Sequence, residues 1–236
     1  MTDFWDEPAG IAPRGTVVVA AGRGETTDAY GRFGRRISAD GYRVRALGDI
    51  TADVDASLAA AGKLLVDDSL PGPKVVVGSD TGALLALMLA ARRAPGLDAL
   101  ILAGLPVADA RPPAVNLLGW DAELEARSAC PTHRGVLGGG AVARGALLST
   151  RIPVELIGAA GIAPALPTLG LHGDADLISP LPAARDRYPG TLVTIAGGRH
   201  DVLNDVTHRT VAATIILFLE RLRLGADLPE IARVPA

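Results

Sequence analysis

The stretch best suited to chemistry is Gly78-Ser79-Asp80-Thr81-Gly82, which lies between a β-branched run and an Ala/Leu-rich run. Two glycines separated by three residues at a strand-to-helix junction are typical of a nucleophile elbow, whose central side chain sits on a strained turn. The central residue is Asp80, and serine stands one place earlier, at Ser79. Aspartate is also a common helix N-cap, which would explain its residue type alone. The two flanking glycines favour a nucleophilic turn.

Two later loops supply a candidate acid and a candidate base. Asp176 follows an apolar run at residues 168–171, and His200 follows another at 191–195. The chain order of elbow, acid and histidine is the order of one known class of catalytic triad. Asp174 is a rival acid, which we expect to be a solvated turn residue. The sequence therefore predicts that Asp80, Asp176 and His200 converge.

Alternating strand and helix patterns would position these loops. We expect strands near 16–20, 42–47, 74–77, 99–103, 168–171 and 191–195, and helices near 28–40, 54–68, 83–90, 181–188 and 205–222. Such alternation predicts the α/β class, with a mostly parallel sheet covered on both faces. The carboxyl ends of parallel strands gather at one edge, where the elbow, the Arg23 loop and the loops of Asp176 and His200 would meet.

The alternation stops between residues 105 and 166, a stretch rich in proline and glycine. We expect a lid-like insertion there, with helices near 121–127 and 141–150. Residues 14–104 and 167–224 would form the core, and residues 1–13 and 225–236 would be terminal arms, the first of them ill-ordered or draped on the surface.

Composition excludes several classes of protein. The 236 residues carry a net charge of −3 and are 49% hydrophobic but only 3% aromatic, which disfavours nucleic acid as a partner. No apolar run is long enough to span a bilayer without interruption, and the acidic N-terminus does not resemble a signal peptide. The single cysteine, Cys130, suits a reducing compartment. We expect a cytoplasmic protein, and Cys130 with His133 offers too few ligands for a zinc site.

Three motifs in this order resemble the monoacylglycerol lipase and lysophospholipase group of the α/β-hydrolase superfamily. Residues 22–25, Gly-Arg-Gly-Glu, together with Tyr30 match the H-G-x-G-E…Y segment of that group. Residues 173–176 match its G-x-x-D acid motif, and residues 198–201 match its histidine loop. The resemblance covers about residues 15–104 and 167–222. It implies an α/β-hydrolase fold with a small lid.

The resemblance also implies roles for the matching residues. Asp176 would be the triad acid and His200 the base. The backbone N–H groups of Arg23 and Thr81 would form an oxyanion hole beside Gly22.

The sequence departs from that group at two positions. Ala21 replaces the histidine before the first glycine, and Asp80 replaces the serine nucleophile. Within the superfamily, haloalkane dehalogenases and epoxide hydrolases carry aspartate at this point. Dehalogenases usually place tryptophan after it, where this chain has Thr81, and epoxide hydrolases use lid tyrosines, which are missing between Gly104 and Pro167.

These observations predict a cofactor-free, metal-free enzyme that acts on a small apolar molecule through Asp80, His200 and Asp176. A carboxylate is already anionic at neutral pH, so it can attack an sp³ carbon without a base. One alternative is a serine esterase or lysophospholipase-like hydrolase that uses Ser79. Others are a lyase or cyclase with Asp80 as general base, and a pseudoenzyme that only binds its ligand. The Arg23 guanidinium could bind an anionic substrate.

Overall fold

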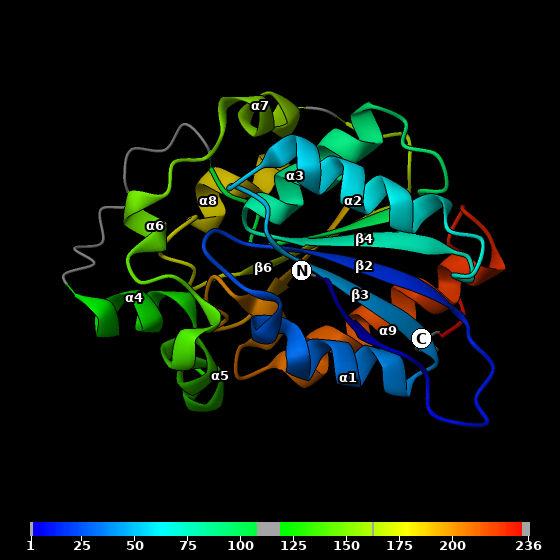
Figure 1. Ribbon diagram of the computed structural model, residues 1–236, viewed down its shortest axis with the longest axis horizontal. Helices are drawn as coiled ribbons and strands as arrows, with labels where there is room; N and C mark the ends of the chain where they lie inside the picture. The colour runs from blue at the N-terminus through cyan, green and yellow to red at the C-terminus, as the bar shows by residue number, and fades with distance from the viewer. Residues whose placement is uncertain (1, 108–118, 162, 233–236) are drawn as a thin grey trace, which may run out of the picture.

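A seven-stranded sheet forms the centre of the protein in the computed structural model, which describes residues 2–107, 119–161 and 163–232 (Figure 1). The strand order is β1-β3-β2-β4-β5-β6-β7. β1 runs antiparallel to β3, and the other neighbouring pairs are parallel. The predicted mostly parallel α/β sheet is therefore confirmed. The chain leaves β2 for β3 on one side and returns for β4 on the other, so a crevice is expected beyond the carboxyl ends of β2 and β4.

The strands are continuous apolar runs because both of their faces are covered. Val17 and Val19 pack into the hydrophobic cluster on one face of the sheet, and Val18 packs into the cluster on the other. Val75 and Val77 of β4 share the first cluster. The strands are β1 (Thr2–Trp5), β2 (Gly15–Ala21), β3 (Tyr42–Asp49), β4 (Lys74–Ser79), β5 (Ala99–Ala103), β6 (Thr168–Gly173) and β7 (Thr191–Ile195).

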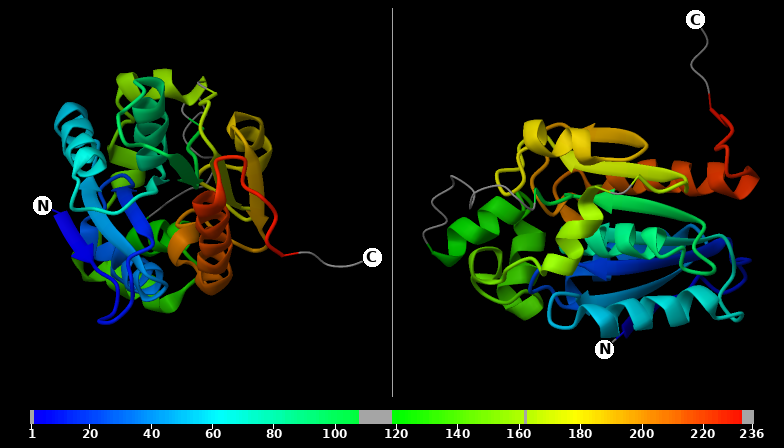
Figure 2. Two further views of the ribbon diagram at one scale, coloured as in Figure 1. Left: turned by 90° about the vertical axis from the view of Figure 1, so that its right-hand side faces the viewer. Right: turned by 90° about the horizontal axis from the view of Figure 1, so that it is seen from above.

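Helices cover both faces of the sheet, as Figures 1 and 2 show. One face carries α1 (Gly31–Ala39) and α9 (His208–Leu224), and the other carries α2 (Val54–Val66), α3 (Thr81–Ala91), α7 (Val154–Ile157) and α8 (Leu181–Ala184). The other helical elements are η1 (Thr27–Tyr30), α4 (Trp120–Arg127), α5 (Pro131–Val136), η2 (Leu137–Ala141), α6 (Ala146–Ser149), η3 (Gly158–Gly161), η4 (Arg185–Arg187) and η5 (Val202–Asn204). Within the described ranges, no helix combines the length and the apolar character needed to cross a membrane.

The N-terminal residues correct one expectation. Residues 1–13 were expected to be an ill-ordered or surface-draped arm without a strand, but Thr2–Trp5 form the edge strand β1, paired with residues 44–47 of β3. The Trp5 ring lies on α1, where a Cβ added to Gly34 would approach it to 2.2 Å. Glu7 forms an ion pair with Arg43 at 2.9 Å. These contacts are all long-range, so the local polar composition of the segment did not reveal them.

The chain between β5 and β6 folds into short helices, of which α4, α5 and α6 lie beyond the carboxyl ends of the strands and α7 lies on one face of the sheet (Figure 1). The helix expected near 121–127 is present as α4. The helix expected at 141–150 is only the single turn α6, because Gly145 adopts a left-handed conformation with φ 76° and starts the helix there. The sequence did not predict α5 or α7. Residues 108–118 and 162 of the expected insertion lie outside the described residues.

Asp53 caps α2, and its side chain predicts a measurable loss of stability. Asp53 Oδ1 accepts a 2.9 Å hydrogen bond from the N–H of Ala56, one of the helix donors that has no partner within the helix. Asp53→Ala is expected to lower the free energy of unfolding by about 1 kcal/mol in urea denaturation. Asp68→Ala, at an exposed carboxylate after the same helix, is the control. Equal effects of the two substitutions would contradict the capping role.

Candidate active site

Asp80 occupies a strained turn between β4 and α3. Its φ of 49° and ψ of −119° are unusual for a residue with a side chain. The two flanking glycines allow the tight bend, since a Cβ at Gly78 would lie 2.2 Å from the carbonyl oxygen of Gly82. A Cβ at Gly82 would lie 2.0 Å from the carbonyl oxygen of Ala20 in β2. The geometry is that of the elbow expected from the glycine spacing.

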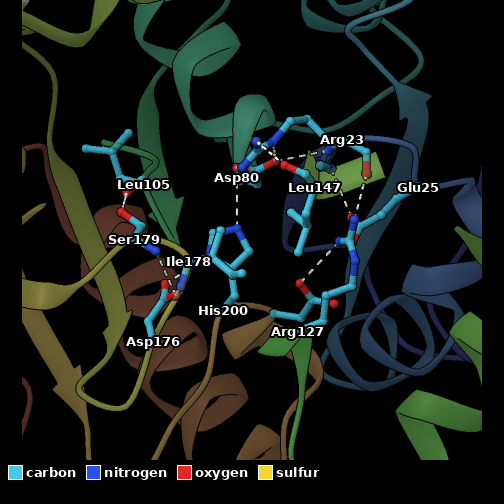
Figure 3. A network of polar contacts seen from close by, with 12 residues as sticks. Arg23, Glu25, Asp80, Leu105, Arg127, Leu147, Asp176, Ile178, Ser179 and His200 are labelled. Carbon is cyan, nitrogen blue, oxygen red and sulfur yellow. Dashed lines mark hydrogen bonds and ion pairs between the residues drawn. The ribbon is translucent and has the colours of Figure 1, made fainter. Parts of the chain in front are cut away.

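The Asp80 carboxylate is held by Arg23, from the loop after β2 (Figure 3). Arg23 Nε donates to Oδ2 at 2.7 Å, and Nη2 donates to Oδ1 at 3.0 Å. The backbone N–H of Arg23 donates to Oδ2 at 3.1 Å. Burial alone would raise the pKa of Asp80, but the charges of Arg23 and His200 outweigh it and hold that pKa well below its usual range. Asp80 is therefore a buried carboxylate anion.

His200 lies between Asp80 and Asp176. Its Nδ1 is 2.8 Å from Asp176 Oδ2, and its Nε2 is 3.3 Å from Asp80 Oδ1. The second contact is an ion pair without hydrogen-bond geometry, so His200 Nε2 has no hydrogen-bond partner in the described part of the chain. Burial alone would lower the pKa of His200, but the two carboxylates raise it to about 10. The imidazole is a cation at neutral pH.

Backbone and side-chain contacts orient Asp176. Its Oδ1 accepts hydrogen bonds from the N–H groups of Ile178 at 2.8 Å and Ser179 at 2.9 Å (Figure 3). His172 Nε2 lies 2.7 Å from the carbonyl oxygen of Ser179 and 3.4 Å from Asp176 Oδ2. Burial lowers the pKa of His172, so its ring is neutral and Nε2 carries the donated proton. Asp176 keeps Oδ2 directed toward His200.

The raised pKa of His200 predicts how stability depends on pH. The folded protein keeps this proton up to about pH 10, whereas an unperturbed histidine loses it near 6.5. The stabilising effect is complete below about pH 6.5, and the free energy of unfolding is expected to fall as pH rises from about 6.5 to about 10. Urea unfolding at several pH values measures this fall. The same fall in His200→Gln would show that another group causes it.

Gly22, Arg23 and Thr81, the residues expected at the oxyanion hole, each make different contacts. The N–H of Arg23 points at the Asp80 carboxylate, as described above. The N–H of Gly22 instead donates to Glu25 Oε2 at 2.9 Å, and a Cβ at Gly22 would lie 3.1 Å from Asp80 Cβ. Thr81 is the first residue of α3, and its buried hydroxyl has no hydrogen-bond partner among the residues described. Gly22 therefore serves close packing beside Asp80, whereas the Arg23 N–H can contact a reacting oxygen.

Ser79 lies beside a different set of side chains. It lines a small pocket with Glu25 and Tyr30, and the Tyr30 hydroxyl interacts with it. The contact of His200 Nε2 is with Asp80. The elbow thus presents Asp80 to the histidine.

A buried arginine, not predicted from the sequence, connects α4 to the site. Arg127 is fully buried and donates from Nη1 to Glu25 Oε1 at 3.1 Å and from Nη2 to the carbonyl oxygen of Arg23 at 3.0 Å (Figure 3). Its guanidinium also lies 3.4 Å from Glu123 and 3.7 Å from Asp201. The only sequence signal was a Glu-x-x-x-Arg spacing, which usually marks an exposed helix face. The contacts hold the peptide that follows Arg23, the residue whose N–H faces Asp80.

The described residues hold no group of three or more His, Cys, Asp or Glu side chains arranged to bind a metal ion. The free thiol of Cys130 is buried, and His133 Nε2 lies 3.3 Å from Asp201 Oδ2.

Comparison with solved structures places the fold. The monoacylglycerol lipase of Paleococcus ferrophilus is similar with a TM-score of 0.73 at 17% identity, over 93% of this chain and 97% of that chain. A soluble variant of the Saccharomyces cerevisiae monoglyceride lipase has a TM-score of 0.70 at 15% identity, over 93% and 91%. A carboxyl esterase from Bacillus coagulans has a TM-score of 0.68 at 18% identity, over 94% of each chain.

These likenesses show the α/β-hydrolase fold that the motifs predicted. At such identities, the reaction of this chain has to be argued from its own residues. No model of a protein family matches the sequence, and no curated protein matches it.

Proposed function

We propose that this protein hydrolyses a small molecule at an sp³ carbon that bears a leaving group, through a covalent ester on Asp80. The observation that carries the proposal is the buried Asp80 anion on the elbow, 3.3 Å from His200 Nε2, with Asp176 on the other ring nitrogen. A carboxylate suits attack on a saturated carbon, because its anion needs no prior deprotonation. With an ester substrate the same attack would give a mixed anhydride, which is a poor intermediate.

The two Asp80 oxygens would have different roles. Oδ2 accepts from both the backbone N–H and the Nε of Arg23, so it suits the position of an oxyanion. Oδ1 faces His200 and would form the bond to carbon while the leaving group departs with its electron pair. The product of this step is a neutral alkyl ester of Asp80.

His200 would act in the second step. Esterification removes the Asp80 charge, one of the two that raise the pKa of His200, so the imidazolium can release its proton to solvent. Neutral His200 then accepts a proton from water as the oxygen attacks the Asp80 ester carbon. The alcohol departs after it takes the proton of the new carboxyl group, and Asp80 returns to its anion. Asp176 would hold the ring throughout.

The segment between β5 and β6 would act as a lid over this site. Its Leu147 carbonyl lies 3.4 Å from Arg23 Nη1, and its Arg127 donates a hydrogen bond to the Arg23 carbonyl.

We further propose a cofactor-free enzyme of the cytoplasm. The lone buried thiol of Cys130 suits a reducing compartment, and the proposed reaction uses only side chains of the triad and water.

Covalent labelling tests the nucleophile. His200→Gln, in which the ester is not hydrolysed, is incubated with neutral primary alkyl bromides and terminal epoxides, and the modified residue is located by peptide mass spectrometry. Added to His200→Gln, Ser79→Ala is expected to leave the label at Asp80, and Asp80→Asn is expected to remove it. A fluorophosphonate probe is expected to label neither the unmodified protein nor these variants. Labelling of Ser79 by that probe would instead indicate a serine hydrolase, and failure of every probe would indicate a binding protein.

A further inference from the structure

We propose that the groove between α1 and α9 binds a small amphipathic monocarboxylate, such as a medium-chain fatty acid. The two helices lie side by side on one face of the sheet (Figure 1). The groove has a volume of about 410 Å³, within the range of about 300–1,000 Å³ that is usual for ligand pockets. Of the described residues that line it, none belongs to the triad, so this site is separate from the proposed active site.

The sequence of α9 carries more apolar residues than the core uses. A helix that covers a sheet usually has one apolar stripe and a polar face opposite. In α9 the core stripe includes Val211, Ile215 and Leu219, all fully buried. Four further apolar residues are spaced so that they share a second face, and these line the groove: Ala212, Ala213, Ile216 and Leu217. Leu217 is 44% exposed, so the protein itself covers this second stripe only in part.

The C-terminal tail supplies another apolar wall. Arg221 Nε donates hydrogen bonds to the carbonyl oxygens of Leu228 at 2.9 Å and Pro229 at 3.0 Å, which brings the tail back to α9. Ile231 then lines the groove and is 45% exposed. An alkyl chain between Ile231 and the second stripe would cover apolar surface on both sides. Each methylene that is fully buried there would strengthen binding about fourfold.

Two cations at the groove have no counter-ion. Arg36 of α1 and Arg209 of α9 line the groove, and their side chains form no ion pair or hydrogen bond with the residues that the structure describes. The Nε of Arg36 is itself buried. A buried N–H without an acceptor is costly, and a carboxylate would supply the acceptor. Burial lowers the pKa of His208, and so do the charges of the surrounding arginines, which is the sign of an uncompensated positive field.

The acidic residues at the groove limit the charge of the ligand. Glu220 is held by Arg14 and by the Tyr42 hydroxyl, so its charge is largely compensated. Asp40 is exposed at the end of α1 and forms no ion pair within the described ranges. Its charge would disfavour a dianion such as a phosphate monoester, whereas two guanidinium groups suit a single carboxylate. These charges and the apolar walls together favour a monocarboxylate with an alkyl chain.

A chain-length series tests the site. Hexanoate, octanoate and decanoate are titrated by calorimetry below their aggregation concentrations, with octanol as the uncharged analogue. Octanoate is expected to bind at a single site per chain, at least about tenfold more tightly than octanol, and affinity should rise by up to about fourfold for each methylene. Arg36→Gln is expected to weaken octanoate binding at least about tenfold and to leave octanol binding unchanged. Leu217→Gln is expected to weaken the binding of both.

Arg35→Gln is the matched control, because Arg35 is an exposed arginine of α1 that does not line the groove. It should bind octanoate like the unmodified protein. If Arg36→Gln does not fold, Arg209→Gln replaces it with the same expected loss. Equal octanoate affinity in the unmodified protein, Arg36→Gln and Leu217→Gln would place the ligand elsewhere and overturn the proposal. Octanol binding as tight as that of octanoate, or no saturable octanoate binding at all, would overturn it as well.

Discussion

Replacement of His200 by glutamine is expected to stop the reaction after its first chemical step. The Asp80 anion can still attack carbon, because Arg23 still holds it and no base is required. Hydrolysis of the ester needs a base for water, which glutamine does not supply. Turnover should fall by about 10²–10⁴-fold, the usual contribution of general acid–base catalysis. The intact mass of the protein should rise by one alkyl group per chain, located at Asp80.

The control for this prediction is His208→Gln, a histidine on α9 that is half-buried and outside the triad. It should turn over like the unmodified protein and accumulate no ester. An unchanged rate in His200→Gln would remove His200 from the mechanism. Loss of both turnover and labelling would show instead that His200 is needed for the first step.

Replacement of Arg127 by methionine is expected to cause a large loss of stability. The substitution leaves the carboxylates of Glu25, Glu123 and Asp201 buried together without their shared cation. Removing one partner of a buried ion pair costs about 3–5 kcal/mol. The pKa of Glu25 is already raised by its burial and by Asp201, so part of the effect should appear as proton uptake. Urea unfolding at neutral pH measures the loss.

Arg134→Met is the matched control. Arg134 forms a 3.1 Å pair with Glu125, whose side chain is 62% exposed, and surface pairs contribute only about 0–1 kcal/mol. A comparable loss in the free energy of unfolding in both variants would mean that the buried cluster contributes no more to stability than the surface pair. Where Arg127→Met still folds, its labelling at Asp80 should be slower, since the carbonyl of Arg23 loses its 3.0 Å donor.

The elbow and the core could be predicted because their signals are local. Gly78 and Gly82 mark the elbow because the backbone passes too close to them for a Cβ. The β-branched runs mark the strands because both faces of the sheet are buried. The convergence of the Asp176 and His200 loops could be predicted from the order of the motifs in the chain and from the parallel topology of the sheet. The structure places these two side chains 2.8 Å apart.

The other features depend on contacts that no local pattern contains. β1 exists because residues 2–5 pair with residues 44–47, and an acidic segment before a proline gave no strand signal. Arg127 occurs in an ordinary charged helix pattern, and only the fold brings Glu25 and Asp201 to it. Similarly, the Arg23 side chain was predicted only as a possible anion ligand, whereas its bidentate pairing with Asp80 required the elbow geometry.

The central claim is that Asp80 forms a covalent ester whose oxygen leaves with the product. A single turnover in water enriched in the heavy isotope of oxygen tests this most directly, with enzyme in excess over an alkyl bromide that labels Asp80. The account predicts that the heavy oxygen appears in the Asp80 carboxylate and that the first alcohol released carries ordinary oxygen. Heavy oxygen in that first alcohol, with none in Asp80, would contradict the account and make Asp80 a base for direct attack by water.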